Sequence, residues 1–223
     1  MAENSYEYGT SITIQMEAEF TQNDAGALVE MGITKNGTLI KSGVDNPLKS
    51  SQESYQLVES ITYSAYAEYE DGIIKNNNLG ESSPEGSIKA GVITSNSKKI
   101  TPYRQGYFYG VLDTDSSVPL TSTIIRSAQK KNGAYSAGNL PLIKASSVTN
   151  RKRIFVACPA EKTGIIKVIM PSAVNADCTA NFVKQIDTIT VEGANGSSGI
   201  PYNVWVYEPA EISDDQTFTV TLG

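Results

Sequence analysis

The chain has 223 residues, of which 39% are hydrophobic and 19% are charged, so it can bury a core and is not disordered by composition. Its net charge of −6 argues against a nucleic-acid-binding protein, because that class carries a basic field. The absence of histidine removes the commonest general base and zinc ligand, and with them the Ser-His-Asp and Cys-His catalytic arrangements.

Targeting and redox signals are sparse. No run of apolar residues is long enough to span a membrane, and residues 1–20 lack the charged start and apolar centre of a signal peptide, so we expect neither membrane insertion nor Sec export. Cys158 lies in the apolar run RIFVACPA and is expected to be a small core residue. A disulfide between Cys158 and Cys178 stays open.

The first half of the chain reads as short strands and turns. From Ser11 to Phe20 apolar and polar residues alternate, which predicts a half-buried strand, and residues 27–34 alternate again. Asn36-Gly37 then predicts a hairpin. Further strands are expected at residues 55–61, 62–69 and 88–94, with a loop at 75–86. This spacing predicts an immunoglobulin-like β-sandwich over residues 1–100.

The second half, residues 101–223, is expected to be a β-sandwich with one packed helix. Thr121 or Ser122 can cap a helix that runs to about Lys131, where Asn132-Gly133 stops it. The expected strands are 106–112, 153–158, 164–170, 186–191, 200–207 and 217–222; the structure of residues 176–182 stays open, and residues 193–199 form a loop.

Several charged groups could carry chemistry. Asp113 and Asp115 could serve glycoside hydrolysis or calcium binding, but a solvated, capping loop is favoured because no calcium-loop spacing follows them. Residues 68–71 place acids at a strand end and turn, where acids are ordinary. The basic run 151–153 could meet an acidic partner, although a solvated strand entry is favoured. We therefore predict no catalytic, cofactor-binding or metal-binding residue.

Aromatic residues crowd two segments of the second half. Tyr103, Tyr107 and Tyr109 lie in the first segment, and Trp205 lies in the second with two further tyrosines. Such side chains can bind sugars or form protein interfaces. Packing within the core or between domains is the favoured interpretation, since alternate residues of a strand must point inward.

A succession of short motifs begins at residue 100: ITPYRQGYFYGVL, LTSTIIRSAQKK, RIFVACPAEKTGIIKVI, DCTANF and IPYNVWVYEPA. This succession is similar to the C-terminal module of tailed-bacteriophage virion structural proteins of the tail-fibre, baseplate-associated and head-fibre types. The stretch at residues 63–94 resembles the immunoglobulin-like unit that often precedes that module. Members of the class are often longer, so a short natural version and a fragment both stay open.

The resemblance implies a non-enzymatic structural protein of the virion, assembled in the host cytoplasm. It would form homo-oligomers, a trimer being one option, and dock on capsid or tail proteins without a cofactor. The residues assigned to an interface or ligand surface are Tyr103, Arg104, Tyr107, Tyr109, Arg126 and Trp205. An alternative is an adhesin module that binds a host-surface glycan or receptor through exposed aromatics. A third hypothesis, a sugar depolymerase using Asp113 and Asp115, ranks lowest.

Overall fold

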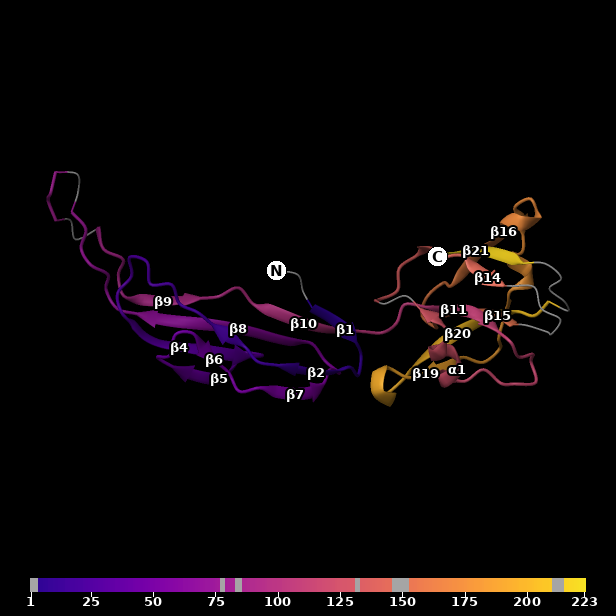
Figure 1. Ribbon diagram of the computed structural model, residues 1–223, viewed down its shortest axis with the longest axis horizontal. Helices are drawn as coiled ribbons and strands as arrows, with labels where there is room; N and C mark the ends of the chain where they lie inside the picture. The colour runs from indigo at the N-terminus through magenta and orange to yellow at the C-terminus, as the bar shows by residue number, and fades with distance from the viewer. Residues whose placement is uncertain (1–3, 77–78, 83–85, 131–132, 146–152, 210–214) are drawn as a thin grey trace. The chain divides into compact units, whose positions relative to one another are not determined.

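The computed structural model describes residues 4–76, 79–82, 86–130, 133–145, 153–209 and 215–223, and this part of the chain is mainly β with one short α-helix (Figure 1). The chain divides into two compact units. The first unit comprises the residues up to Tyr6 together with Ser11–Pro102, and the second comprises Glu7–Thr10 together with Tyr103–Gly223. None of the described helices is long and apolar enough to cross a membrane.

The division between the units falls after Pro102, close to the boundary expected at residue 100. The polar residues 95–99 are exposed, and Lys98 and Lys99 open strand β10 (Lys98–Tyr103), which pairs with β8 (Ile61–Tyr69). The sequence did not indicate that Glu7–Thr10, near the start of the chain, groups with the second unit.

The first unit is an antiparallel β-sandwich. One layer has the strand order β1-β10-β8-β4-β5, with β9 pairing on the edge of β8 that β10 also uses. The facing layer consists of the pairs β2-β7 and β3-β6. The remaining bounds are β1 (Asn4–Glu7), β2 (Ser11–Ile14), β3 (Glu17–Ala18), β4 (Leu28–Lys35), β5 (Thr38–Gly43), β6 (Leu48–Lys49), β7 (Glu53–Gln56) and β9 (Gly91–Thr94).

This strand order corresponds to an immunoglobulin-like sandwich in which one layer is narrow. Strands β4, β5, β8 and β9-β10 take the places of strands C, C′, F and G, while β2-β3 and β6-β7 take the places of B and E. In the described part of the chain, no strand takes the place of A or D in the second layer. One long side of the sandwich is therefore left without its covering strand.

Local sequence explains the elements of the first unit. The hairpin between β4 and β5 turns at Asn36 and Gly37, whose φ angles of 50° and 81° both lie in the left-handed region, as the Asn-Gly signal predicts. The apolar residues between Ser11 and Phe20 pack inward as the alternation predicts, but the single strand expected there is divided into β2 and β3. The core they join contains Ile12, Met31, Ile33, Leu48, Leu57, Ile61, Tyr63, Ala67 and Ile100.

The second unit contains two larger sheets. One has the order β12-β11-β15-β20-β18 with β19 also on β20, and the other has the order β13-β21-β16-β17 with β14 also on β21. The strand bounds are β11 (Phe108–Leu112), β12 (Gln129–Lys130), β13 (Gly138–Asn139), β14 (Ile143–Ala145), β15 (Arg153–Pro159), β16 (Ile165–Met170), β17 (Ala176–Asp177), β18 (Val183–Lys184), β19 (Ile189–Val191), β20 (Ile200–Tyr207) and β21 (Gln216–Leu222). The short 3-10 helices are η2 (Pro171–Ala173), η3 (Thr179–Asn181) and η4 (Ala194–Gly196).

Strand β15 lies at the centre of the second unit, and all seven of its residues are buried. On one face Ile154, Val156 and Cys158 join the core between the two sheets. On the other face Phe155 and Ala157 belong to a second cluster, which includes the helix. Because both faces of β15 are covered, its sequence is a continuous apolar run in which apolar and polar residues do not alternate. Cys158 and Cys178 are both free and buried.

The helix is shorter than predicted. Helix α1 (Ser122–Ser127) begins as expected, with the Thr121 hydroxyl accepting a hydrogen bond from the Ile124 amide at 3.3 Å. It ends before residue 131 because Ala128 is extended and the next two residues form β12, which pairs with β11. The expected stop at Asn132 lies outside the described residues. The strand predicted at 186–191 is likewise shorter, since β19 starts at Ile189.

Candidate functional site

Three of the residues assigned to a surface are buried in the second unit. Tyr107, Tyr109 and Trp205 are 7%, 6% and 9% exposed and lie in the core between the two sheets. Gly164, at φ +78°, packs so closely on the indole of Trp205 that an added Cβ would lie 2.0 Å from one of its ring carbons. These aromatics therefore form no exposed platform, which corrects the surface assignment and agrees with the packing interpretation.

Tyr103 and Arg104 contact the N-terminal segment Glu7–Thr10. The Tyr8 amide donates a hydrogen bond to the Tyr103 carbonyl at 2.8 Å. The Arg104 guanidinium lies over the Tyr8 ring, 3.5 Å from its centroid, and its Nη1 donates to the Ser198 carbonyl. A stacked guanidinium of this kind is a favourable cation–π contact. Tyr103 and Arg104 thus bind the segment Glu7–Thr10, which belongs to the same unit as they do.

Arg126 is the centre of a partly buried ionic cluster. Its Nη1 donates to Glu7 Oε1 and to the Glu192 carbonyl, both at 2.6 Å. The other carboxylate oxygen of Glu7 accepts from Gln105 at 3.0 Å and lies 3.7 Å from the Lys130 ammonium. Burial by itself would raise the pKa of Glu7, but the hydrogen bonds from Arg126 and Gln105 and the charges of Arg126 and Lys130 together lower it.

The loop at residues 193–199 completes the attachment of this segment. The Ala194 amide donates to the Tyr8 carbonyl at 2.8 Å, and the Asn195 side chain donates to the Gly9 carbonyl at 3.0 Å. Gly9 has φ +88°, and an added Cβ would lie 2.4 Å from the Ala194 carbonyl oxygen. The loop expected at residues 193–199 is therefore bonded to Tyr8 and Gly9, which lie near the other end of the sequence, and no local sequence pattern reveals this contact.

The acidic candidates occupy turns. Asp115 Oδ1 accepts from the Ser117 amide at 3.0 Å, and Asp71 Oδ1 accepts from the Ala90 amide at 2.6 Å. The hydrogen bond from Ala90 lowers the pKa of Asp71. Among the described residues, no group of three Asp, Glu or Cys side chains could hold a metal ion. Within the basic run only Arg153 is described, and it is 4% exposed.

The first unit has an open groove along the side where, among the described residues, no strand takes the place of A in the second layer. Three hollows of about 490, 250 and 270 Å³ follow one another there. The first two share Met16 and Tyr63, and the last two share Ala18 and Ala65. Strands β2 and β3 line one wall, and β9, β10 and the residues between them line the other, with β1, which pairs with β10, contributing Asn4 and Tyr6 to the first hollow. We call this feature the open groove.

Ile93 shows that the open groove exposes surface that a closed sandwich would bury. It pairs with Ala67, which is 6% exposed and belongs to the core, so both side chains are on the inner face of the sheet. Ile93 nevertheless remains 55% exposed and lines the third hollow. Its neighbour Val92 pairs with the exposed Glu68 on the outer face.

Comparisons with known proteins give no further guide to the site: no protein-family model matches the chain, and neither curated proteins nor solved structures match it.

Proposed function

We propose that the chain is a non-enzymatic structural protein of a tailed-bacteriophage virion, a fibre, decoration or tail component that self-associates and docks on capsid or tail proteins. The motif succession described above motivates the class of protein. The observation that carries the mode of action is the open groove, with the inward-facing Ile93 that none of the described strands covers. An unpaired strand edge beside an apolar hollow is a ready acceptor for another chain.

The occupant that we propose for the open groove is the same side of a second copy. Glu17 and Glu19 line the wall formed by β3 and the residue after it, where Glu17 also lies 3.3 Å from the Lys49 ammonium of its own copy, while Lys98 lines the wall formed by β10. A two-fold axis parallel to the strands would bring the acidic wall of each copy opposite the basic wall of the other. The groove is therefore self-complementary in charge, as an isologous interface requires.

Light scattering over a concentration series tests this proposal. We expect the wild-type chain to form an oligomer and Ile93→Asp to be monomeric, because the substitution places a charge in the apolar contact. Val92→Asp is the matched control, since it alters the outer face of the same strand and should assemble like the wild type. A monomeric wild type, or equal effects of the two variants, would contradict assembly through the groove.

A further inference from the structure

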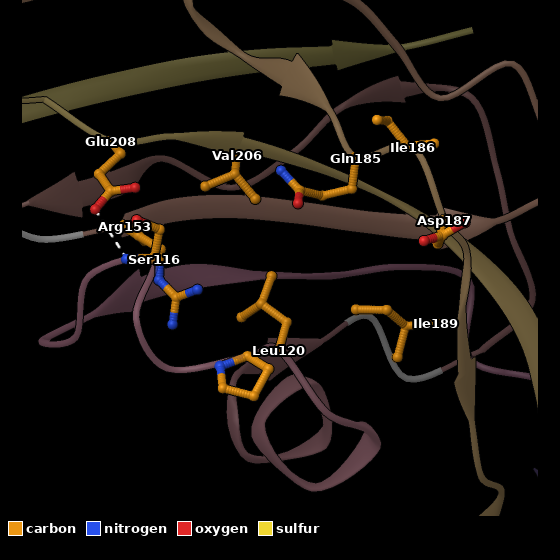
Figure 2. A pocket seen from close by; sticks show the side chains of 10 residues that line it. Ser116, Leu120, Arg153, Gln185, Ile186, Asp187, Ile189, Val206 and Glu208 are labelled. Carbon is orange, nitrogen blue, oxygen red and sulfur yellow. Dashed lines mark hydrogen bonds between the residues drawn. The ribbon is translucent and has the colours of Figure 1, made fainter.

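A separate hollow of about 410 Å³ lies in the second unit, on the face of the six-stranded sheet that α1 also covers (Figure 2). One side is formed by the loop before α1, with Ser116 and Leu120, and by Arg153 and Glu208. The opposite side is the loop between β18 and β19, which carries Gln185 and Asp187. The volume is in the range of about 300–1,000 Å³ that small-molecule sites occupy.

The Arg153 side chain, which is the positively charged group of this hollow, is held in a fixed position. Arg153 is 4% exposed, and its guanidinium donates from Nε to the Thr114 carbonyl at 3.0 Å and from Nη2 to the Thr114 hydroxyl at 2.9 Å. In the described part of the chain, no residue accepts a hydrogen bond from its Nη1. A rigid donor is thus available at the lining without further ordering of the side chain.

The other polar groups of the lining supply both hydrogen-bond donors and hydrogen-bond acceptors. Glu208 Oε1 accepts from the Ser116 amide at 2.9 Å, which holds the carboxylate at the edge of the hollow. Gln185 offers an amide donor and acceptor, and Asp187 offers a carboxylate; Figure 2 shows the two on the same loop, across from Glu208. Hydroxyl groups can both donate to such carboxylates and accept from Arg153 and Gln185.

The charges of the lining disfavour an anionic ligand. An anion would face the carboxylates of Asp187 and Glu208, which outnumber the single guanidinium of Arg153, whereas a neutral ligand meets no net repulsion. The side chains of Leu120, Ile189 and Val206 add an apolar surface to the same hollow. A ring with hydroxyls at its rim and C–H groups on its face fits both parts of this lining.

We propose that this hollow is a binding site for a neutral sugar, with Arg153, Gln185 and Asp187 as the hydrogen-bonding residues and Leu120 and Val206 as the apolar surface. The proposal does not depend on assembly through the open groove, because the groove belongs to the first unit. It supplies a glycan-binding capacity that uses no exposed aromatic platform.

The test is an NMR titration of the isotope-labelled full chain with glucose, galactose, mannose and N-acetylglucosamine. At least one of these sugars should shift the amide signals of residues 185–189 and 204–208 in a saturable way. Asp187→Ala should weaken that binding at least about tenfold, the loss expected for a hydrogen bond to a charged group. Glu161→Ala is the matched control, since it removes an exposed carboxylate outside the hollow and should leave binding unchanged.

Two results would overturn the proposal. The first is the absence of any saturable shift at these residues with all four sugars. The second is tighter binding of a sugar acid than of the neutral sugars, which would show that negative charge is not selected against. Because Gln185 and Asp187 are exposed, Gln185→Ala serves as a second variant should Asp187→Ala fail to fold.

Discussion

Replacing Arg126 by alanine should destabilise the second unit by about 2 kcal/mol. The change removes two hydrogen bonds of 2.6 Å and leaves the Glu7 carboxylate, 12% exposed, with only Gln105 and Lys130. A hydrogen bond to a charged group contributes about 1.5–3 kcal/mol, and breaking a fully buried pair costs about 3–5 kcal/mol. The lower part of this range applies because both side chains keep some exposure and Glu7 keeps a partner.

Urea unfolding followed by the fluorescence of Trp205 measures this effect selectively. Trp205 is the chain's single tryptophan and is buried in the second unit, so its signal reports that unit. Glu7→Gln and the double variant complete a thermodynamic cycle, whose coupling free energy we expect to be about 1 kcal/mol. Lys144→Ala, an exposed change on β14, is the control. A coupling indistinguishable from zero, or an Arg126→Ala variant as stable as the control, would refute the reasoning.

Three further predictions concern the same unit. Because the pKa of Glu7 is lowered, its coupling to Arg126 should be complete at neutral pH and disappear as pH falls through that pKa; an unchanged coupling in acid would contradict it. Gly9→Ala should cost about 2 kcal/mol or more in urea unfolding, whereas Gly196→Ala, at φ +67° with open space around it, should cost about 1 kcal/mol. Burial raises the pKa of Cys158 to about 12, so native protein should resist thiol alkylation until it unfolds, and rapid native labelling would argue against this packing.

Local patterns were sufficient for some elements of this fold but not for all, since the strand expected at residues 55–61 is β7 at Glu53–Gln56. The alternation of Ser11–Phe20 and the Asn36-Gly37 turn depend on neighbouring residues, and the structure confirms both. The cap at Thr121 is local as well, so the start of α1 was predictable. The helix end was not, because residues 129–130 form strand pairs with β11, a tertiary interaction that overrides the helical pattern.

The candidate sites depended on contacts between distant parts of the sequence. Arg126 was singled out by its motif, but its partner Glu7 is 119 positions away and follows no spacing rule. The hollow around Arg153 forms because the residues between β18 and β19 leave the sheet, whereas a continuous strand was expected from residue 186. The open groove results because no described strand takes the place of A or D in the second layer, and the number of strands alone does not reveal which edge stays uncovered.

Hydrogen exchange of the backbone amides at low and high protein concentration tests assembly through the open groove most directly. The account predicts that amides of residues 11–18 and 91–95 gain protection as concentration rises, while those of β5, at the opposite edge of the sheet, do not change. Protection that is independent of concentration at the groove, or that appears instead at β5, would contradict the account.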